Sequence, residues 1–155
     1  MSNLALNGRM EDPPPQESLP TDASQKLILI VDHDESILEF VEYMIKKEGF
    51  RTDRAIGGIQ ALRKVSALSP DLIILDFMLA GSGMGGYEVL RELQASGSGN
   101  IPVIVITGRR HMDDKAIEKL RLEPNVREFM EMPLQPAIMS AALHSLLRTR
   151  LSDRA

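Results

Sequence analysis

Hydrophobic residues along this chain follow two patterns that alternate five times. The first is a short run, mostly of Leu, Ile and Val, with the length and composition of a strand buried on both faces. The second is a longer segment in which apolar residues recur every three or four positions, as on one face of a helix. The expected strands are residues 27–31, 51–55, 71–75, 101–106 and 125–130, and the expected helices are residues 34–49, 58–69, 86–96, 112–122 and 136–147.

Strands that alternate with helices through short connections predict an α/β fold, because right-handed crossovers between parallel strands place helices on both faces of the sheet. Residues 51–55 are the polar exception among the expected strands, so we expect them near an edge. Asp34 is expected to cap the first helix and Gly49 to end it. We therefore expect a flavodoxin-like, doubly wound, five-stranded parallel sheet.

The first 25 residues lack this periodicity. They contain Pro13, Pro14 and Pro15 among Asn, Ser and Gln residues, and they carry too little apolar surface to offset the entropy of ordering. We expect a disordered N-terminal tail over residues 1–25, one folded domain over residues 26–150 and a short C-terminal tail over the last five residues.

The composition narrows the range of functions. With 155 residues, of which 43% are hydrophobic and 26% charged, the chain has the composition of an ordinary globular protein. It has no Cys, which excludes disulfides and thiolate metal sites. Its net charge of −4 disfavours a general affinity for nucleic acid, and its apolar runs are too short to span a bilayer. We expect a cytoplasmic protein with no membrane association and no direct nucleic-acid partner.

Polar residues follow three of the expected strands. Asp32, His33 and Asp34 come after the first strand, Asp76 after the third and Thr107 after the fourth. In an open parallel sheet the carboxyl ends of the strands meet at one edge, which is where such folds place their chemistry. We expect a small acidic pocket there that can hold a cation and an acyl-phosphate.

Four stretches resemble, in their order and spacing, the receiver domain of bacterial two-component response regulators. The resemblance implies that Asp76 is the phosphoacceptor, which takes a phosphoryl group from the phosphohistidine of a sensor histidine kinase or a phosphotransfer protein. The protein would then act on a downstream protein partner and would not be an enzyme. The stretches are ILIVDHDE at residues 28–35, PDLIILDFML at 70–79, GYEVL at 86–90 and IPVIVITG at 101–108, within a resemblance over essentially residues 26–150.

The same resemblance assigns roles to the surrounding residues. It implies a Mg²⁺ ion held by Asp32, Asp76 and the backbone carbonyl of Met78, since Mg²⁺ requires oxygen ligands. It implies that Thr107 donates a hydrogen bond to a phosphoryl oxygen. It also places Phe129 at the aromatic switch position, whose ring moves together with that threonine.

Two positions depart from the family pattern. His33 stands where the family has a second acid, and its imidazole is a doubtful Mg²⁺ ligand that suits softer metals. Met132 stands at the position of the family's Lys, so a cation near the phosphoryl group is missing. Arg109 and Arg110 follow the fourth expected strand and are candidates to replace that Lys, with a solvated position as the alternative. We expect a weakened or altered metal site.

Three functions stay open on these residues. The first is a single-domain response regulator that is switched by phosphorylation of Asp76. The second is a pseudo-receiver that keeps the fold as an interaction module without phosphorylation. The third and most remote is a phosphatase of the haloacid-dehalogenase type, with Asp32 as the nucleophile and Asp34 as the general acid. That function leaves the stretch around Asp76 unexplained.

Overall fold

A five-stranded, entirely parallel sheet forms the centre of the computed structural model, which describes residues 19–79, 84–108 and 113–150. The strand order is β2-β1-β3-β4-β5. The strands are β1 (Leu27–Val31), β2 (Arg51–Ala55), β3 (Leu72–Asp76), β4 (Val103–Thr107) and β5 (Val126–Glu131). The helices that alternate with them are α1 (Glu35–Lys47), α2 (Gly58–Leu68), α3 (Gly86–Ala95), α4 (Asp114–Arg121) and α5 (Pro136–Leu147).

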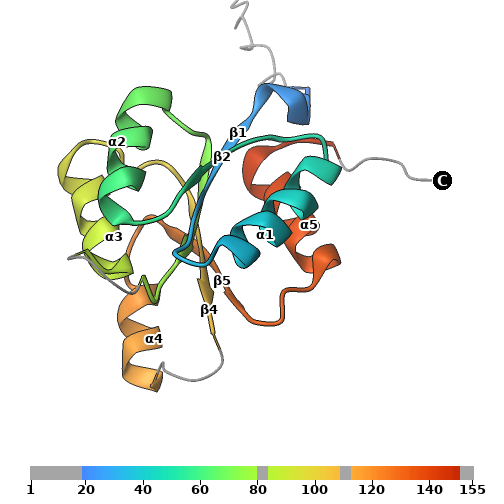
Figure 1. Cartoon of the computed structure of the whole chain (residues 1–155). Helices are drawn as coiled ribbons and strands as arrows, with labels where there is room; N and C mark the ends of the chain where they lie inside the picture. The colour runs from blue at the N-terminus through green and yellow to red at the C-terminus, as the bar shows by residue number, and fades with distance from the viewer. Residues whose placement is uncertain (1–18, 80–83, 109–112, 151–155) are drawn as a thin grey trace, which may run out of the picture.

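Different helices cover the two faces of the sheet. Helices α1 and α5 pack on one face, and α2, α3 and α4 pack on the other (Figure 1). Each face has its own apolar core, to which the side chains of the central strands contribute alternately. This arrangement confirms the predicted flavodoxin-like, doubly wound fold. Within the described ranges, no helix is both long and apolar enough to cross a bilayer.

Burial explains which strands are central. Every residue of β3 and β4 is buried, as expected for continuous apolar runs with helices on both sides. The edge strand β2 has only Ala55 in the buried class, and the opposite edge strand β5 has only Met130. The expectation that residues 51–55 lie at an edge is therefore confirmed.

Helix α1 begins and ends as the sequence predicts. Asp34 is its N-cap, and the Asp34 Oδ1 atom accepts a hydrogen bond of 2.9 Å from the backbone N–H of Ser36. Beyond its other end Gly49 has a φ of 95°, in the left-handed region that favours glycine, and its N–H donates to the carbonyl of Lys46. The carboxylate of Asp34 is thus engaged in capping α1.

The folded part of the chain starts before residue 26. Ala23 lies in a 3-10 turn (Ala23–Gln25) and is only 9% exposed, because it packs into the core between the sheet and α1. Thr21 forms a parallel bridge with Thr149. The structure therefore differs here from the disordered tail expected up to residue 25. The domain boundaries otherwise stay a prediction, because the rest of both expected tails lies outside the described residues.

A buried histidine connects the ends of α1 and α5. His144 is 4% exposed, its Nδ1 atom lies 2.6 Å from the hydroxyl of Thr149, and its Nε2 atom lies 3.0 Å from a carboxylate oxygen of Glu48. The ring also packs against Phe50, with 5.0 Å between the ring centroids. Both ring nitrogens have partners, as a buried polar side chain requires.

A charged network holds the edge strand β2 to α1. The carboxylate of Glu42 accepts two hydrogen bonds of 2.9 Å from Arg54 and bonds of 3.2 Å from Thr52 and Lys46. The hydrogen bonds from Arg54 are the largest cause that lowers the pKa of Glu42 from 4.5 to about 2. Charged side chains on an edge strand also oppose pairing with another chain.

Replacing Glu42 by Gln is expected to lower the free energy of unfolding by about 1–2 kcal/mol at neutral pH, because Arg54 loses its carboxylate partner. The folded pKa lies below the ordinary value, so this stabilisation is present above a pH of 4.5 and is lost as the pH falls towards about 2. Urea unfolding followed by circular dichroism measures the difference at each pH. Glu92→Gln, at an exposed position of α3, is the control. A difference between E42Q and the wild type that is as large near pH 3 as near pH 7 contradicts the prediction.

Candidate functional site

Three buried polar residues lie at the carboxyl edge of the sheet. The register of β1 and β3 places Asp32 beside Asp76. Asp76 pairs with Ile106 on β4, so Thr107, the next residue of that strand, lies at the same edge. Asp32, Asp76 and Thr107 are all buried, with exposed fractions of 3%, 8% and 2%. The expected convergence of strand ends is present in the structure.

Backbone N–H groups fix the orientation of both carboxylates. The Asp32 Oδ1 atom accepts a hydrogen bond of 2.9 Å from the N–H of Asp34, and the Asp76 Oδ1 atom accepts one of 3.0 Å from the N–H of Met78. In each turn the aspartate accepts from the residue two positions further on, which is a turn that Asp side chains favour. These two donors were not predicted from the sequence, although an Asp at the end of a strand is a signal for such a turn.

His33 lies between the two carboxylates. Its Nδ1 atom is 3.5 Å from Oδ1 of Asp32 and 3.3 Å from Oδ2 of Asp76. The histidine side chain is 43% exposed, whereas the aspartate side chains are 4% and 10% exposed. The residue that the sequence marks as a doubtful ligand thus shares the pocket with both carboxylates.

Negative charge in this pocket is unfavourable. Burial is the largest cause that raises the pKa of Asp32 from 3.8 to about 6, and the hydrogen bond from the Asp34 N–H opposes it. The charge of Asp76 and a hydrogen bond between the two carboxyl groups raise this pKa further, and the charge of His33 lowers it. A cation beside Asp32 would offset this penalty on its negative charge.

Asp32, His33 and Asp76 are the one group of potential metal ligands found within the described ranges, with ligand atoms that all lie within 4.8 Å of one another. The two carboxylates suit a divalent cation. The imidazole does not suit Mg²⁺, which takes oxygen ligands, but it suits transition metals. Asp34 is engaged in capping α1, and a contribution from the carbonyl of Met78 stays a prediction.

The predicted switch residues lie on neighbouring strands. Thr107 ends β4, and Phe129 lies half-buried on β5. The N–H of Met132 donates a hydrogen bond of 2.9 Å to the carbonyl of Thr107, which connects the end of β4 to the loop before α5. The half-buried side chain of Met132 packs against the core between the sheet and α5. Arg109 and Arg110, the candidate replacements for the missing Lys, lie outside the described residues.

The chain directly after Asp76 is held from two sides. The N–H of Phe77 donates to the carbonyl of Ile106 at 3.0 Å. A Cβ atom on Gly86, the first residue of α3, would lie 2.8 Å from the carbonyl oxygen of Phe77. Any residue larger than glycine at this position would collide with the backbone. The start of α3 therefore packs directly against the turn that follows Asp76.

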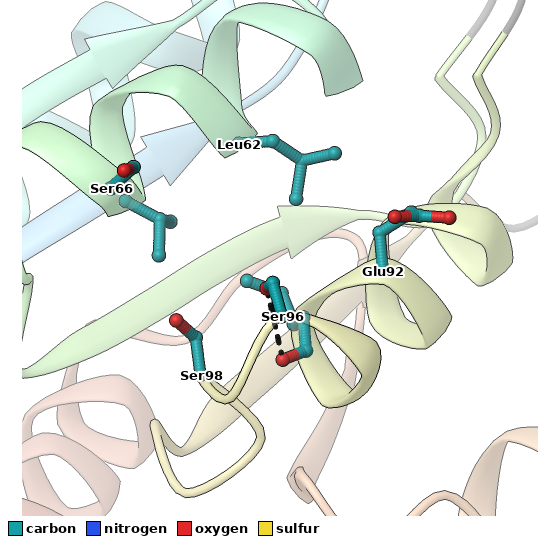
Figure 2. A pocket seen from close by; sticks show the side chains of 7 residues that line it. Leu62, Ser66, Glu92, Ser96 and Ser98 are labelled. Carbon is teal, nitrogen blue, oxygen red and sulfur yellow. Dashed lines mark hydrogen bonds between the residues drawn. The ribbon is translucent and has the colours of Figure 1, made fainter.

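A separate groove of about 210 Å³ lies between α2 and α3. In Figure 2, α2 contributes Leu62 and Ser66, and α3 and the loop after it contribute Glu92, Ser96 and Ser98. Because these helices run antiparallel to the strands, their C-terminal halves lie towards the amino edge of the sheet. The groove is lined by one titratable residue, Glu92, and we assign it no role in the chemistry at Asp76.

Residues 28–144 match the response regulator receiver domain family. The chain is 34% identical over 127 residues to the DNA-binding response regulator MtrA of Mycobacterium tuberculosis (strain ATCC 25618 / H37Rv), a match that covers 82% of this chain and 53% of MtrA. It is 32% identical over 123 residues to the alkaline phosphatase synthesis transcriptional regulatory protein PhoP of Bacillus subtilis (strain 168), with 79% and 49% covered. The chain thus spans about half the length of these curated relatives.

Solved structures share the fold. NtrX from Brucella abortus matches with a TM-score of 0.69 and 26% identity, covering 78% of this chain and 26% of NtrX. A response regulator receiver domain protein from Clostridium thermocellum matches with a TM-score of 0.67 and 22% identity, covering 79% of this chain and 94% of that protein. At 22% identity the second likeness supports the fold alone.

The prediction about partners is wrong where it excludes nucleic acid. It rests on the net charge of −4, whereas MtrA is named as a DNA-binding response regulator and PhoP as a transcriptional regulatory protein. A net charge is a sum over the whole chain, so it says nothing about where basic residues gather on the surface. These relatives also extend well beyond the matched region, and the net charge of this chain does not describe that part of them.

Without divalent cations, replacing Asp32 by Asn is expected to raise the free energy of unfolding by about 1–3 kcal/mol near pH 8. The folded pKa of Asp32 is raised from 3.8 to about 6, so the wild type loses stability as the pH rises through this window, and D32N lacks this loss. The difference is expected to vanish below about pH 4.

Urea unfolding with a chelator present, repeated across this pH range, measures the difference. Asp34→Asn is the matched control, because it lies in the same turn, is exposed and keeps a capping side chain. If the stability of the wild type and of D32N depends on pH in the same way, the penalty assigned to the buried carboxylate is wrong.

Proposed function

Because the chain belongs to the response regulator receiver domain family, we propose that Asp76 accepts a phosphoryl group in two-component signalling. The observation that carries this proposal is the position of Asp76 at the carboxyl end of the central strand β3. There its Oδ1 atom is held by a backbone N–H, and its Oδ2 atom faces the half-exposed His33. A buried carboxylate with one oxygen directed at the accessible side of the pocket suits a nucleophile.

The proposed reaction takes the phosphoryl group from a phosphohistidine of a sensor kinase. Oδ2 of Asp76 forms the new P–O bond while the P–N bond to the kinase imidazole breaks, and the leaving nitrogen keeps the electron pair. The N–H of Met78 holds Oδ1, and so fixes the plane of the carboxylate during the transfer. Such a transfer depends mainly on positioning and on compensation of negative charge.

Positive charge is the main requirement of this pocket. A divalent cation held by Asp32, Asp76 and the carbonyl of Met78 would offset the charge of the phosphoryl oxygens, and Mg²⁺ is the ion that the sequence resemblance implies. Asp32 is oriented for that role by the N–H of Asp34. The hydroxyl of Thr107 would donate to a phosphoryl oxygen.

We propose that Thr107 passes the phosphorylated state to the rest of the domain. Its carbonyl accepts the N–H of Met132, so a movement of Thr107 would reach the loop before α5. Phe129, half-buried on the neighbouring strand β5, would fill the space that Thr107 leaves. The names of MtrA and PhoP make the control of DNA binding the output that we propose for this switch.

A second function, that of a pseudo-receiver without phosphorylation, is favoured by His33 and Met132. His33 brings an imidazole to within 3.5 Å of both carboxylates, where the family has an acid. Met132, at the position of the family's Lys, is half-buried and packs against the core. A domain of this kind would keep the fold as a binding module and would leave Asp76 unmodified.

Incubation of the purified chain with acetyl phosphate and a divalent cation is expected to add the mass of one phosphoryl group, measured by intact-protein mass spectrometry. Asp76→Asn is expected to remove this mass shift, because the nucleophilic oxygen is lost. Asp114→Asn, at an exposed position of α4, is the control that keeps the mass shift. If the wild type gains no mass with Mg²⁺ or with Mn²⁺, the proposed phosphorylation fails and the pseudo-receiver is supported.

Replacing Met132 by Lys is expected to speed phosphorylation of Asp76 by about 10- to 100-fold, since one charge-assisted contact to the phosphoryl group stabilises it by about 1.5–3 kcal/mol. The time course of the same mass shift gives the rate. Gln135→Lys adds an equal charge at an exposed position of the same loop and serves as the matched control. Equal rates for M132K and Q135K would show that position 132 does not face the phosphoryl group.

A further inference from the structure

We propose that Asp32, His33 and Asp76 bind a first-row transition cation, of the series from Mn²⁺ to Zn²⁺, in preference to Mg²⁺, and that His33 is the residue that selects it. The inference rests on the proposed function in that it concerns the cation of the same pocket. It goes beyond that function by assigning the imidazole nitrogen of His33 as a metal ligand and, for that reason, a transition metal in place of Mg²⁺.

The distances in the pocket suit three ligands on adjacent positions of one ion. The Nδ1 atom of His33 lies 3.5 Å from Oδ1 of Asp32 and 3.3 Å from Oδ2 of Asp76. Two ligands at right angles, each about 2.1 Å from an octahedral ion, lie about 3 Å apart. The two distances from the histidine are only about 0.3–0.5 Å longer than this spacing. The ligand atoms of all three residues lie within 4.8 Å of one another.

The chemistry of the three donors favours a transition cation. Imidazole suits Fe²⁺, Ni²⁺, Cu²⁺ and Zn²⁺, and Co²⁺ lies between Fe²⁺ and Ni²⁺ in the order of affinity for such ligands. Mg²⁺ gives up its waters reluctantly and takes oxygen ligands. Neutral imidazole in place of a carboxylate also lowers the negative charge of the ligand set from three to two. A hard cation such as Mg²⁺ depends most on that charge, so the substitution weakens Mg²⁺ binding and strengthens binding of the borderline ions.

The same geometry also fits a different arrangement, in which a protonated imidazole lies between the carboxylates as their counter-ion. In that arrangement His33 occupies the place of the metal and excludes it. In the proposed arrangement, Nδ1 is unprotonated and bonds to the metal. A spectroscopic signal from an imidazole ring bonded to the metal distinguishes the proposed arrangement from the counter-ion arrangement.

The test uses the untagged full chain without any phosphodonor. Dissociation constants for Co²⁺ and Mg²⁺ are measured by titration of the wild type, of His33→Asp and of His111→Gln, the last as the control for another histidine. The ¹H NMR spectrum of the Co²⁺-loaded protein shows whether imidazole ring protons carry the large shifts of a ligand bound to a paramagnetic ion. Circular dichroism verifies that each variant is folded.

The wild type and H111Q are expected to bind Co²⁺ about 100-fold more tightly than Mg²⁺ and to show shifted imidazole protons. H33D is expected to lose those signals and to reduce the Co²⁺ to Mg²⁺ preference about tenfold or more, mainly through tighter Mg²⁺ binding. The proposal is overturned if H33D and the wild type have the same preference, if Co²⁺ binds without shifted imidazole protons, or if the wild type binds neither ion.

These outcomes are independent of phosphorylation. Binding of Co²⁺ through His33 in a protein that never gains a phosphoryl group would uphold the metal site and reject the phosphoacceptor. Phosphorylation of Asp76 supported by Mg²⁺, with no imidazole on the metal, would reject the metal site and uphold the phosphoacceptor.

Discussion

The pocket is dominated by two buried carboxylates, which the register of neighbouring parallel strands places side by side. The rest of the pocket has to compensate their negative charge. Asp32 and Asp76 are each less than a tenth exposed, and burial together with the charge of Asp76 raises the pKa of Asp32 to about 6. A cation near these carboxylates would offset that cost, and the neighbouring residues affect which cation suits the site. The proposed phosphoryl transfer adds further negative charge at the same point, so it depends on the same compensation.

The apolar sheet makes this unfavourable arrangement possible. Strands β3 and β4 are buried along their whole length between two layers of helices, and that packing offsets the free energy lost by burying charge at their ends. The N–H groups of Asp34 and Met78 then fix the carboxylate planes, and the contact of Gly86 with Phe77 fixes the turn after Asp76. The interior of the sheet thus provides the stability, and the carboxyl edge carries the candidate site.

The residues at positions 33 and 132 affect which positive charge can lie near the two carboxylates, and they leave the sheet and its turns unchanged. Met132, which the sequence resemblance places at the position of a Lys, is half-buried against the core, and His33 places a nitrogen within 3.5 Å of both carboxylates. Both substitutions remove support for Mg²⁺ and phosphate, but only His33 offers a replacement, since its imidazole can bind a transition cation. What lies between Asp32, His33 and Asp76 therefore determines how the charge of the two carboxylates is compensated.

The sequence alone predicted the order of the elements and the family, and it placed Asp32, Asp76 and Thr107 at the ends of strands. The bounds of β1 and β2 and the cap at Asp34 agree with the structure, because periodicity and capping are local properties. Only the tertiary structure placed His33 against both carboxylates, Ala23 in the core and His144 beside Glu48, 96 residues away in the chain. The exclusion of a nucleic-acid partner was wrong, because the net charge of the whole chain is an average that does not exclude DNA binding, which the name of MtrA states for that relative. The contacts of His33 and His144 join residues that lie far apart in the chain or depend on side-chain positions in the folded pocket, and no local pattern in the sequence encodes them.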